Sequence, residues 1–193
     1  MNIGLLALQG GYSAHAAVLK KLNVETTFVR NLQDLTCTEG LIIPGGESSV
    51  FIKLLQENGL WEALTHYKKP LFGTCAGAIL LAKQVLYPSQ TNLKHMDITI
   101  ERNAYGRQLA SQVKIGRCLL SQKEIEMVFI RAPKITAITG KNIKILAKYA
   151  DQPVAVEQAN CIATTFHPEL SQDYSLHTYF IEKIKNQSSC ALA

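Results

Sequence analysis

The sequence lacks the features that mark secreted, metal-stapled and membrane-spanning chains. Its five cysteines form no Cys-x-x-Cys pair, and their odd number argues against both a disulfide framework and a zinc site. No apolar run approaches the ~18 residues of a membrane span. The amino terminus has no basic region before its apolar segment, so it does not resemble a signal peptide. These absences predict a cytoplasmic protein with reduced thiols, no metal and no membrane contact.

Charge is also scarce. Charged residues make up 18% of the chain and hydrophobic residues 47%, a balance that excludes general disorder. The formal net charge is +5 and no run of five or more like charges occurs, so we expect no nucleic-acid-binding arm. A chain of 193 residues is long enough for one good core, which predicts a single domain over residues 1–193.

The two halves of the chain differ in pattern. The first half alternates short apolar runs with amphipathic stretches, which predicts βαβ units and a parallel sheet. The second half carries short strand-like pieces suited to antiparallel additions, then a closing helix over 174–184 and a frayed tail over 186–193. The expected strands are 3–8, 24–29, 40–43, 71–72, 98–100, 113–115, 127–130, 143–147, 154–156 and 162–166, and the other expected helices are 13–22, 48–55 and 76–82.

The most informative segment is residues 70–81, which have the form strand, Gly-x-Cys-x-Gly, helix. This is the pattern of a nucleophile elbow with cysteine in the place of serine. The turn would present Cys75 at the carboxyl end of the sheet and at a helix N-terminus, whose dipole favours the reactive thiolate. A buried cysteine after a core strand is the alternative, but the flanking Gly73 and Gly77 favour a nucleophile.

A thiolate nucleophile needs a histidine, and the histidine needs an orienting acceptor. His167 directly follows an apolar strand, and Pro168 biases it to an extended conformation. Residues two apart on an extended segment face the same side, so Glu169 can orient the imidazole. Alone, the motif also suits a loop histidine before a helix start, but beside the cysteine elbow it is a strong signal. The remaining histidines are expected as surface or packing residues without a catalytic role: His15, His66, His95 and His177.

A third element runs from a strand at 41–43 into the turn Pro44-Gly45-Gly46-Glu47-Ser48. Such a turn exposes backbone N–H groups able to stabilise an oxyanion. An ordinary glycine-rich turn with a serine cap is the alternative. Neither G-x-x-x-x-G-K-[ST] nor G-x-G-x-x-G occurs, which argues against nucleotide binding.

Together these three motifs resemble the class I, triad-type glutamine amidotransferases. Further segments are similar to the glutaminase subunits of pyridoxal 5′-phosphate synthase, and the resemblance covers residues 3–170 in order. Glutaminases of histidine, purine or cobalamin synthesis share the triad but lack the Glu-Arg-Asn-x-x-Gly-Arg-Gln segment. The segments that restrict the resemblance to these subunits are 4–10, 101–108 and 129–133.

The resemblance implies a flavodoxin-like α/β fold, an open and mostly parallel sheet with helices on both faces. It implies that Cys75 is the nucleophile, His167 the general base and acid, and Glu169 the orienting carboxylate. Backbone N–H groups of Gly46 and Ala76 would form the oxyanion hole. The glutamine-binding residues that it implies are Gly46, Glu47, Ser48, Arg107, Ile130 and Arg131.

Elementary chemistry agrees with these assignments. A guanidinium group can bind the α-carboxylate of glutamine through two parallel hydrogen bonds, and Glu47 could form an ion pair with the α-ammonium. For Arg107 and Arg131 a plain surface role is the alternative, and only the motif match favours substrate binding.

The resemblance also implies a partner and an activity. L-Glutamine would be hydrolysed to glutamate and ammonia through a Cys75 thioester, with no cofactor. The ammonia would pass to a (β/α)₈-barrel synthase subunit in a large hetero-oligomer that makes pyridoxal 5′-phosphate. Gln9 matches a residue near the partner-facing loop that is linked to the oxyanion hole. The alternatives are a glutaminase of another pathway, a peptidase-like cysteine hydrolase and a non-catalytic interaction subunit.

Overall fold

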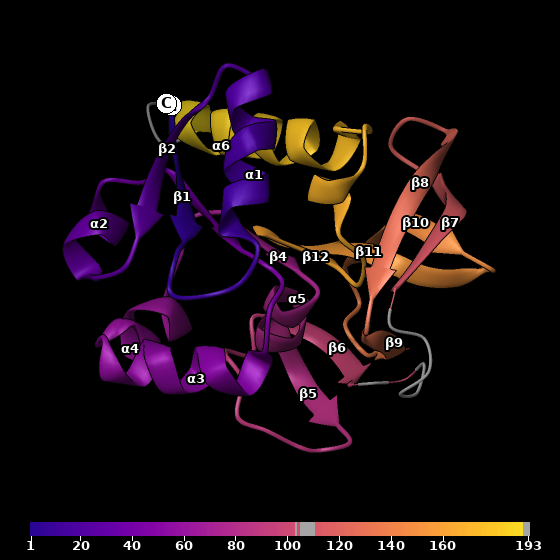
Figure 1. Cartoon of the computed structure of the whole chain (residues 1–193), viewed down its shortest axis with the longest axis horizontal. Coiled ribbons are helices and arrows are strands. Elements are labelled where there is room, and N and C mark those ends of the chain that lie inside the picture. Colours follow the sequence, from indigo (N-terminus) through magenta and orange to yellow (C-terminus); the bar gives the residue numbers. More distant parts are fainter. Residues whose placement is uncertain (103, 105–110, 191–193) are drawn as a thin grey trace.

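A computed structural model describes residues 1–102, 104 and 111–190 (Figure 1). Its strands are β1 (Asn2–Leu6), β2 (Glu25–Val29), β3 (Gly40–Ile43), β4 (Leu71–Thr74), β5 (Ala82–Leu86), β6 (Met96–Glu101), β7 (Ser111–Cys118), β8 (Lys123–Ile130), β9 (Lys134–Ile138), β10 (Ile143–Tyr149), β11 (Gln152–Gln158) and β12 (Cys161–Thr164). Its helices are α1 (Tyr12–Lys21), α2 (Leu32–Thr36), α3 (Ser48–Glu57), α4 (Leu60–Thr65), α5 (Ala76–Leu81), the 3₁₀ turn η1 (Pro168–Leu170) and α6 (Ser175–Cys190).

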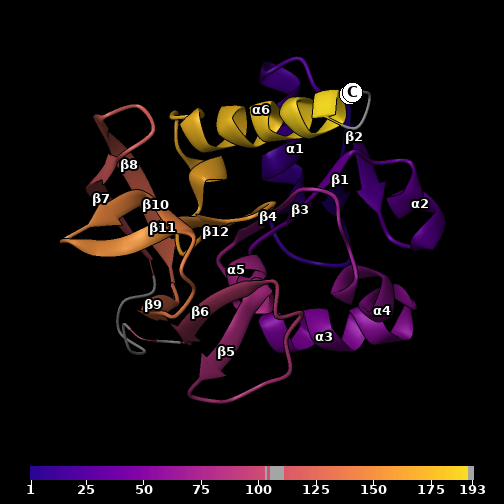
Figure 2. The same ribbon diagram turned by 180° about the vertical axis from the view of Figure 1, so that it is seen from behind.

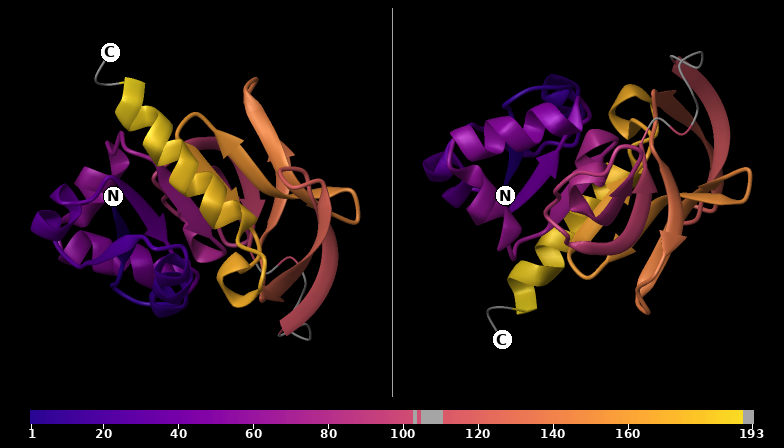
Figure 3. Two further views of the ribbon diagram at one scale, coloured as in Figure 1. Left: turned by 90° about the horizontal axis from the view of Figure 1, so that it is seen from above. Right: turned by 90° about the horizontal axis from the view of Figure 1, so that it is seen from below.

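The strands form two sheets. The larger has the order β2-β1-β3-β4-β12-β11-β10-β7-β8, and a smaller one has the order β5-β6-β9. In the larger sheet the pairings from β2 to β12 are parallel, and those from β12 to β8 are antiparallel. Figure 3 shows the parallel strands and the antiparallel strands at opposite ends of the molecule.

Helices cover both faces of the parallel strands. Helices α1 and α6 lie on one face, and α3, α4 and α5 lie on the other (Figures 1 and 2). This arrangement confirms the expected α/β fold. No helix of the described residues is both long enough and apolar enough to cross a membrane.

The alternation of side chains along the strands explains the two layers. Ile42 packs into the apolar cluster under α1 and α6, whereas its neighbours Leu41 and Ile43 pack into the cluster with α3 to α5. Phe72 and Leu71 divide in the same way. Successive residues of a strand point to opposite faces, so strands covered on both sides are continuous apolar runs in the sequence. That is why the sequence predicts these strands.

The structure extends several expected elements and adds others. The pieces expected at 113–115 and 127–130 lie within the eight-residue strands β7 and β8. In β8 the added Lys123, Glu124 and Glu126 are charged and exposed, whereas in β7 Val113 and Ile115 are themselves exposed. Helix α6 continues to Cys190, where a frayed tail was expected from residue 186; residues 191–193 lie outside the described part. The elements that the sequence did not predict are α2, α4, β5 and β9. They have five or six residues each, too few for a clear periodicity.

The pairing of β4 with β12 positions the site. These parallel neighbours end in register, with Thr74 opposite Thr164. Cys75 follows β4 directly, and His167 comes three residues after the end of β12. Ligands of open α/β sheets bind at the carboxyl ends of the strands. Two segments that lie far apart in the sequence therefore meet at one edge.

Candidate active site

Cys75 occupies a strained turn between β4 and α5. Its backbone has φ 49° and ψ −104°, in a region that a non-glycine residue rarely adopts. The turn is held by the Cys75 amide, which donates to the Thr164 carbonyl at 2.8 Å. A Cβ at Gly77 would lie 2.0 Å from the Ile43 carbonyl oxygen, so only glycine lets α5 approach β3 this closely. The expected elbow geometry is present, with the thiol at the open end of the sheet.

His167 and Glu169 are linked directly. Because a carboxylate only accepts hydrogen bonds, His167 Nδ1 carries the proton and donates to Glu169 Oε1 at 2.7 Å. The His167 amide donates to the Val128 carbonyl at 2.8 Å, which ties the histidine to β8. Glu169 lies in η1 and is buried, with 7% of its surface exposed.

The electrostatics of the pair follow from its burial and contacts. Burial lowers the pKa of His167, but hydrogen bonds to Cys75 and Glu169 outweigh it and raise the pKa to about 10. Burial raises the pKa of Glu169, but His15 and His167 lower it by more. The net pKa is therefore below its usual value, and the carboxyl stays ionised. The site therefore favours an imidazolium held between a thiol and a carboxylate.

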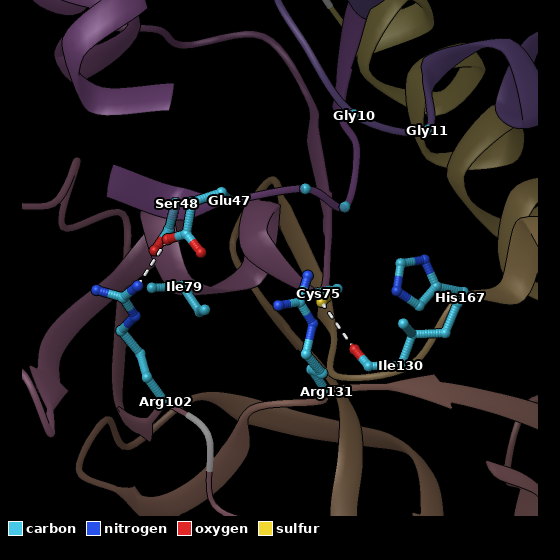
Figure 4. Close-up of a pocket in the computed structure, with 12 residues that line it drawn as sticks. Gly10, Gly11, Glu47, Ser48, Cys75, Ile79, Arg102, Ile130, Arg131 and His167 are labelled. Atoms are coloured by element: carbon cyan, nitrogen blue, oxygen red, sulfur yellow. Dashed lines mark hydrogen bonds and ion pairs between the residues drawn. The ribbon is translucent and has the colours of Figure 1, made fainter. Parts of the chain in front are cut away.

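These groups open into a pocket of about 250 Å³ (Figure 4). The Cys75 Sγ donates weakly to the Ile130 carbonyl, 3.9 Å away. A Cβ at Gly45 would lie 2.3 Å from His167 Cε1 and 3.3 Å from Cys75 Cβ, so this glycine leaves the space in which the two side chains meet. The pocket is lined by Gly10, Gly11, Gly45, Gly46, Glu47, Ser48, Cys75, Ile79, Arg102, Ile130, Arg131 and His167.

Most residues expected to bind glutamine line this pocket. Gly46, Glu47 and Ser48 border it at the start of α3, and Ile130 and Arg131 border it at the end of β8. Arg107 lies outside the described residues. Arg131 has φ 43°, a second strained non-glycine conformation at the pocket.

The two expected oxyanion donors lie on the β3–α3 turn and on α5. Ala76 is the first residue of α5, where backbone N–H groups have no intrahelical partner. Gln9 stabilises the turn that carries Gly46, because its Nε2 donates to the Glu47 carbonyl at 2.8 Å. The Gly45 carbonyl accepts from the Gly11 amide at 3.0 Å, so the segment after β1 also fixes the turn.

Arg102 and Gln90 interact at the pocket although no role was predicted for them. Arg102 Nη2 lies 2.7 Å from Glu47 Oε1, and Arg102 Nη1 donates to Gln90 Oε1 at 2.8 Å. Gln90 Oε1 also accepts from Ser48 Oγ at 2.9 Å. Arg102 belongs to the Glu-Arg-Asn segment, so a motif did mark its position. Gln90 lies in a loop without periodicity, and no sequence signal pointed to it.

The other histidines divide into two kinds. His66 is exposed, with 69% of its side chain accessible, and His95 is partly buried. His15 and His177 are completely buried, as the packing alternative expects; His15 lies 3.4 Å from Glu169 and 3.0 Å from His177. No group of three or more His, Cys, Asp or Glu residues is placed to hold a metal ion in the part of the chain described.

The sequence matches the SNO glutamine amidotransferase family over residues 5–186. The chain belongs to that family. It is 48% identical to "Pyridoxal 5′-phosphate synthase subunit PdxT" of Koribacter versatilis, with 98% of each chain covered. The protein of the same description from Pseudothermotoga lettingae is 46% identical, with 98% of this chain and all of the other covered.

Solved structures agree with membership of the SNO family. A crystal structure described as a glutamine amidotransferase superposes with a TM-score of 0.87 at 40% identity, covering 95% of this chain and 98% of the other. A Thermoplasma acidophilum protein described as a putative component of GMP synthase has a TM-score of 0.74 at 18% identity, with 100% of this chain and 98% of the other covered, a likeness of fold alone. The open α/β architecture is thus shared well beyond the family.

Proposed function

We propose that this chain is the glutaminase subunit of a pyridoxal 5′-phosphate synthase, hydrolysing L-glutamine to glutamate and ammonia. The observation that carries the proposal is the strained Cys75 beside the His167–Glu169 pair, in a pocket that holds both Glu47 and Arg131. A thiol, a carboxylate-supported imidazole and side chains of both charges are what an amino-acid amide requires. Membership of a glutamine amidotransferase family supports the same reaction.

The reaction runs in two halves. The Cys75 thiolate attacks the side-chain amide carbon of glutamine, and His167 protonates the nitrogen that leaves as ammonia. A γ-glutamyl thioester remains on Cys75. His167 then takes a proton from water, the hydroxide attacks the thioester, and glutamate leaves as the thiolate is restored. Glu169 keeps the imidazole oriented and its positive charge stabilised through both halves.

Substrate binding uses the charged rim of the pocket. Arg131 and Arg107 receive the α-carboxylate, and Glu47 receives the α-ammonium. The backbone amides of Gly46 and Ala76 stabilise the oxyanion of the tetrahedral intermediate, since fixed N–H donors match a charge that develops in the transition state. Ser48 and Ile130 complete the wall of the pocket.

The product dictates a partner. Free ammonia in water is mostly protonated and no longer nucleophilic, so it must pass to a synthase by a protected path. We assign the partner as a (β/α)₈-barrel synthase subunit in a large hetero-oligomer, with Gln9 at the contact that organises the oxyanion turn. The chain acts as a single domain in the cytoplasm, where a reactive thiol stays reduced.

Glutamate release from glutamine tests the proposal. Wild type and Cys75→Ala are each assayed with and without the synthase partner, and Cys37→Ala, at an exposed position outside the pocket, is the matched control. We expect turnover that needs Cys75, rises with the synthase and survives in the control.

The other outcomes assign the alternatives. Activity that needs Cys75 but ignores the synthase would indicate a glutaminase of another pathway. No glutamate under any condition would indicate a peptidase-like hydrolase or a non-catalytic subunit.

A further inference from the structure

Two histidines lie in the core directly behind the carboxylate of Glu169. His15 comes from α1 and His177 from α6, and both are fully buried. His15 Nδ1 lies 3.0 Å from His177 Nε2, within hydrogen-bond distance. Phe72 contacts both rings edge-on, which fixes their planes. Burying an imidazole costs free energy that one shared hydrogen bond only partly offsets. The position of these two rings therefore needs a physical reason.

The second nitrogen of His15 faces the site. His15 Nε2 lies 3.4 Å from Glu169 Oε2 and 3.2 Å from Thr74 Oγ1, and Thr74 is the residue before Cys75. The two oxygens of Glu169 therefore face two different imidazoles, Oε1 toward His167 and Oε2 toward His15. Within the described residues Oε2 is buried and forms no hydrogen bond, so the 3.4 Å contact with His15 Nε2 is close but electrostatic.

The contacts fix where the protons are. A carboxylate oxygen only accepts, so His15 Nε2, which faces Glu169 Oε2, carries a hydrogen. In neutral imidazole Nδ1 is then the acceptor, and His177 Nε2 must donate to it. His177 Nδ1 is buried without a hydrogen-bond partner among the described residues. A bare lone pair there is less costly than an orphaned N–H, so both rings take the Nε2–H form.

Both rings are also neutral. Burial lowers the pKa of His15, and it outweighs the opposing effect of Glu169; the charge of His167 lowers it further. Burial is the main cause that lowers the pKa of His177, to about 3. Thr74, the remaining polar neighbour of His15, carries no charge. The Nε2–H dipole of His15 thus lies 3.4 Å from Oε2 without a competing charge, and the negative charge of Glu169 is left to support His167.

We propose that His15 is a positioning residue for the reaction, a neutral imidazole that holds the Glu169 carboxylate in place while His177 fixes its tautomer. This role rests on the proposed function, because it acts through Glu169 on His167 and Cys75. A carboxylate held by one partner alone could rotate away from His167. With one imidazole facing each of its oxygens, it keeps a single orientation through both halves of the reaction.

The tautomers can be read without any variant or activity. In wild-type protein labelled with ¹⁵N-histidine, two-bond ¹H–¹⁵N correlation spectra separate the two neutral tautomers and the imidazolium. We expect both His15 and His177 as neutral Nε2–H forms near pH 7. His15 as the Nδ1–H form, or as an imidazolium, would overturn the proposal. Neither result depends on whether the chain hydrolyses glutamine.

Two matched variants test the effect on the triad. His15→Gln can place an amide N–H near the original Nε2 and so keep the donor for Glu169. His15→Asn, one methylene shorter, reaches only the Nδ1 position and keeps the His177 contact instead. The readouts are kcat and KM for glutamine, the pH profile of Cys75 alkylation by iodoacetamide, and the melting temperature.

We expect His15→Asn to lower kcat about tenfold relative to His15→Gln with little change in KM, as for loss of an outer hydrogen-bond partner. The alkylation profile of Cys75 should move to higher pH in the same variant, since the thiolate loses its imidazolium support. Equal kcat and alkylation in the two variants, whatever their melting temperatures, would reduce His15 to a packing residue. If no form hydrolyses glutamine, the proposed function fails, and the alkylation profiles and tautomers still decide the role of His15.

Discussion

At the scale of single residues, two residues that line the pocket have a strained backbone. Cys75 and Arg131 both have positive φ although neither is glycine. Such conformations cost of order 1–3 kcal/mol each and persist only where the surroundings determine them. For Cys75 the surroundings are the Thr164 carbonyl that accepts its amide and the close contact of α5 with β3 through Gly77. The strain aims the thiol into the pocket instead of the core.

Gly45→Ala tests how tightly the side chains of Cys75 and His167 are placed. The new methyl group would lie 2.3 Å from His167 Cε1, so the ring must turn away from Cys75. Because a misplacement of about 1 Å can cost about a hundredfold in rate, we expect a loss of kcat of that order. Steady-state glutaminase kinetics measure it. Gly59→Ala is the control: it strains the backbone at φ 68° but has nothing within 4 Å and lies outside the pocket, so it should lower stability and keep its rate. Equal rates in the two variants would contradict the geometry.

At the scale of elements, the site depends on which strands are neighbours. β4 and β12 pair in parallel although they are separated by the whole antiparallel part of the chain. The inserted part is not passive. The carbonyl of Val128 in β8 accepts a hydrogen bond from the His167 amide. Gln90, in the loop after β5, accepts hydrogen bonds from Ser48 and Arg102. The sheet edge supplies Cys75 and His167 to the pocket, and the inserted part supplies Arg102, Ile130 and Arg131.

Gln90→Ala tests how the inserted part contributes to the pocket. Two hydrogen bonds to Gln90 Oε1 would be lost, one from Ser48 and one from Arg102. At about 0.5–1.5 kcal/mol each, their loss should raise KM for glutamine roughly tenfold, with little change in kcat because neither bond touches the reacting atoms. Ser89→Ala, on the same loop and exposed, is the matched control. A fall in kcat at constant KM would place Gln90 in the chemistry instead.

At the scale of the whole molecule, burial of neutral histidines couples folding to pH. The pKa of His177 is lowered to about 3 and that of His15 is also lowered, in both cases mainly by burial. Below the usual histidine pKa of about 6.5 the unfolded chain binds protons at these positions, and the folded chain does not. Stability is therefore complete above that pH and is lost progressively on acidification toward about pH 3. The lowered pKa of Glu169 acts in the same direction at the acid end.

His177→Gln tests this coupling. The variant removes one buried titrating group, so the free energy of unfolding should fall less steeply with acidification, by about 1.4 kcal/mol per pH unit between about pH 6 and pH 4. Urea unfolding followed by circular dichroism at several pH values measures the slope. His66→Gln, at an exposed position, should leave it unchanged. Parallel curves for wild type and His177→Gln would show that His177 is charged in the folded protein.

Local patterns determined much of the fold and the main site residues. Continuous apolar runs marked β1, β3 and β4 because these strands are buried on both faces. The glycines around Cys75 and the Pro after His167 are local signals, since each restricts the backbone at its own position. These local patterns predicted βαβ units and a parallel sheet. The open sheet with helices on both faces was predicted from the family resemblance. The roles of the triad and of the glutamine-binding residues stay predictions.

Only the tertiary structure decided what depends on long-range contact. The pairing of β4 with β12, the Gln90 bridge and the closeness of His15, His177 and Glu169 join segments far apart along the chain. No local pattern encodes such contacts, because an imidazole on an amphipathic helix looks the same whether it faces a carboxylate or an apolar core. The sequence by itself thus determined the fold class and the residues that lie at one sheet edge. The packing of α1 and α6 against that edge decided how those residues are held in place.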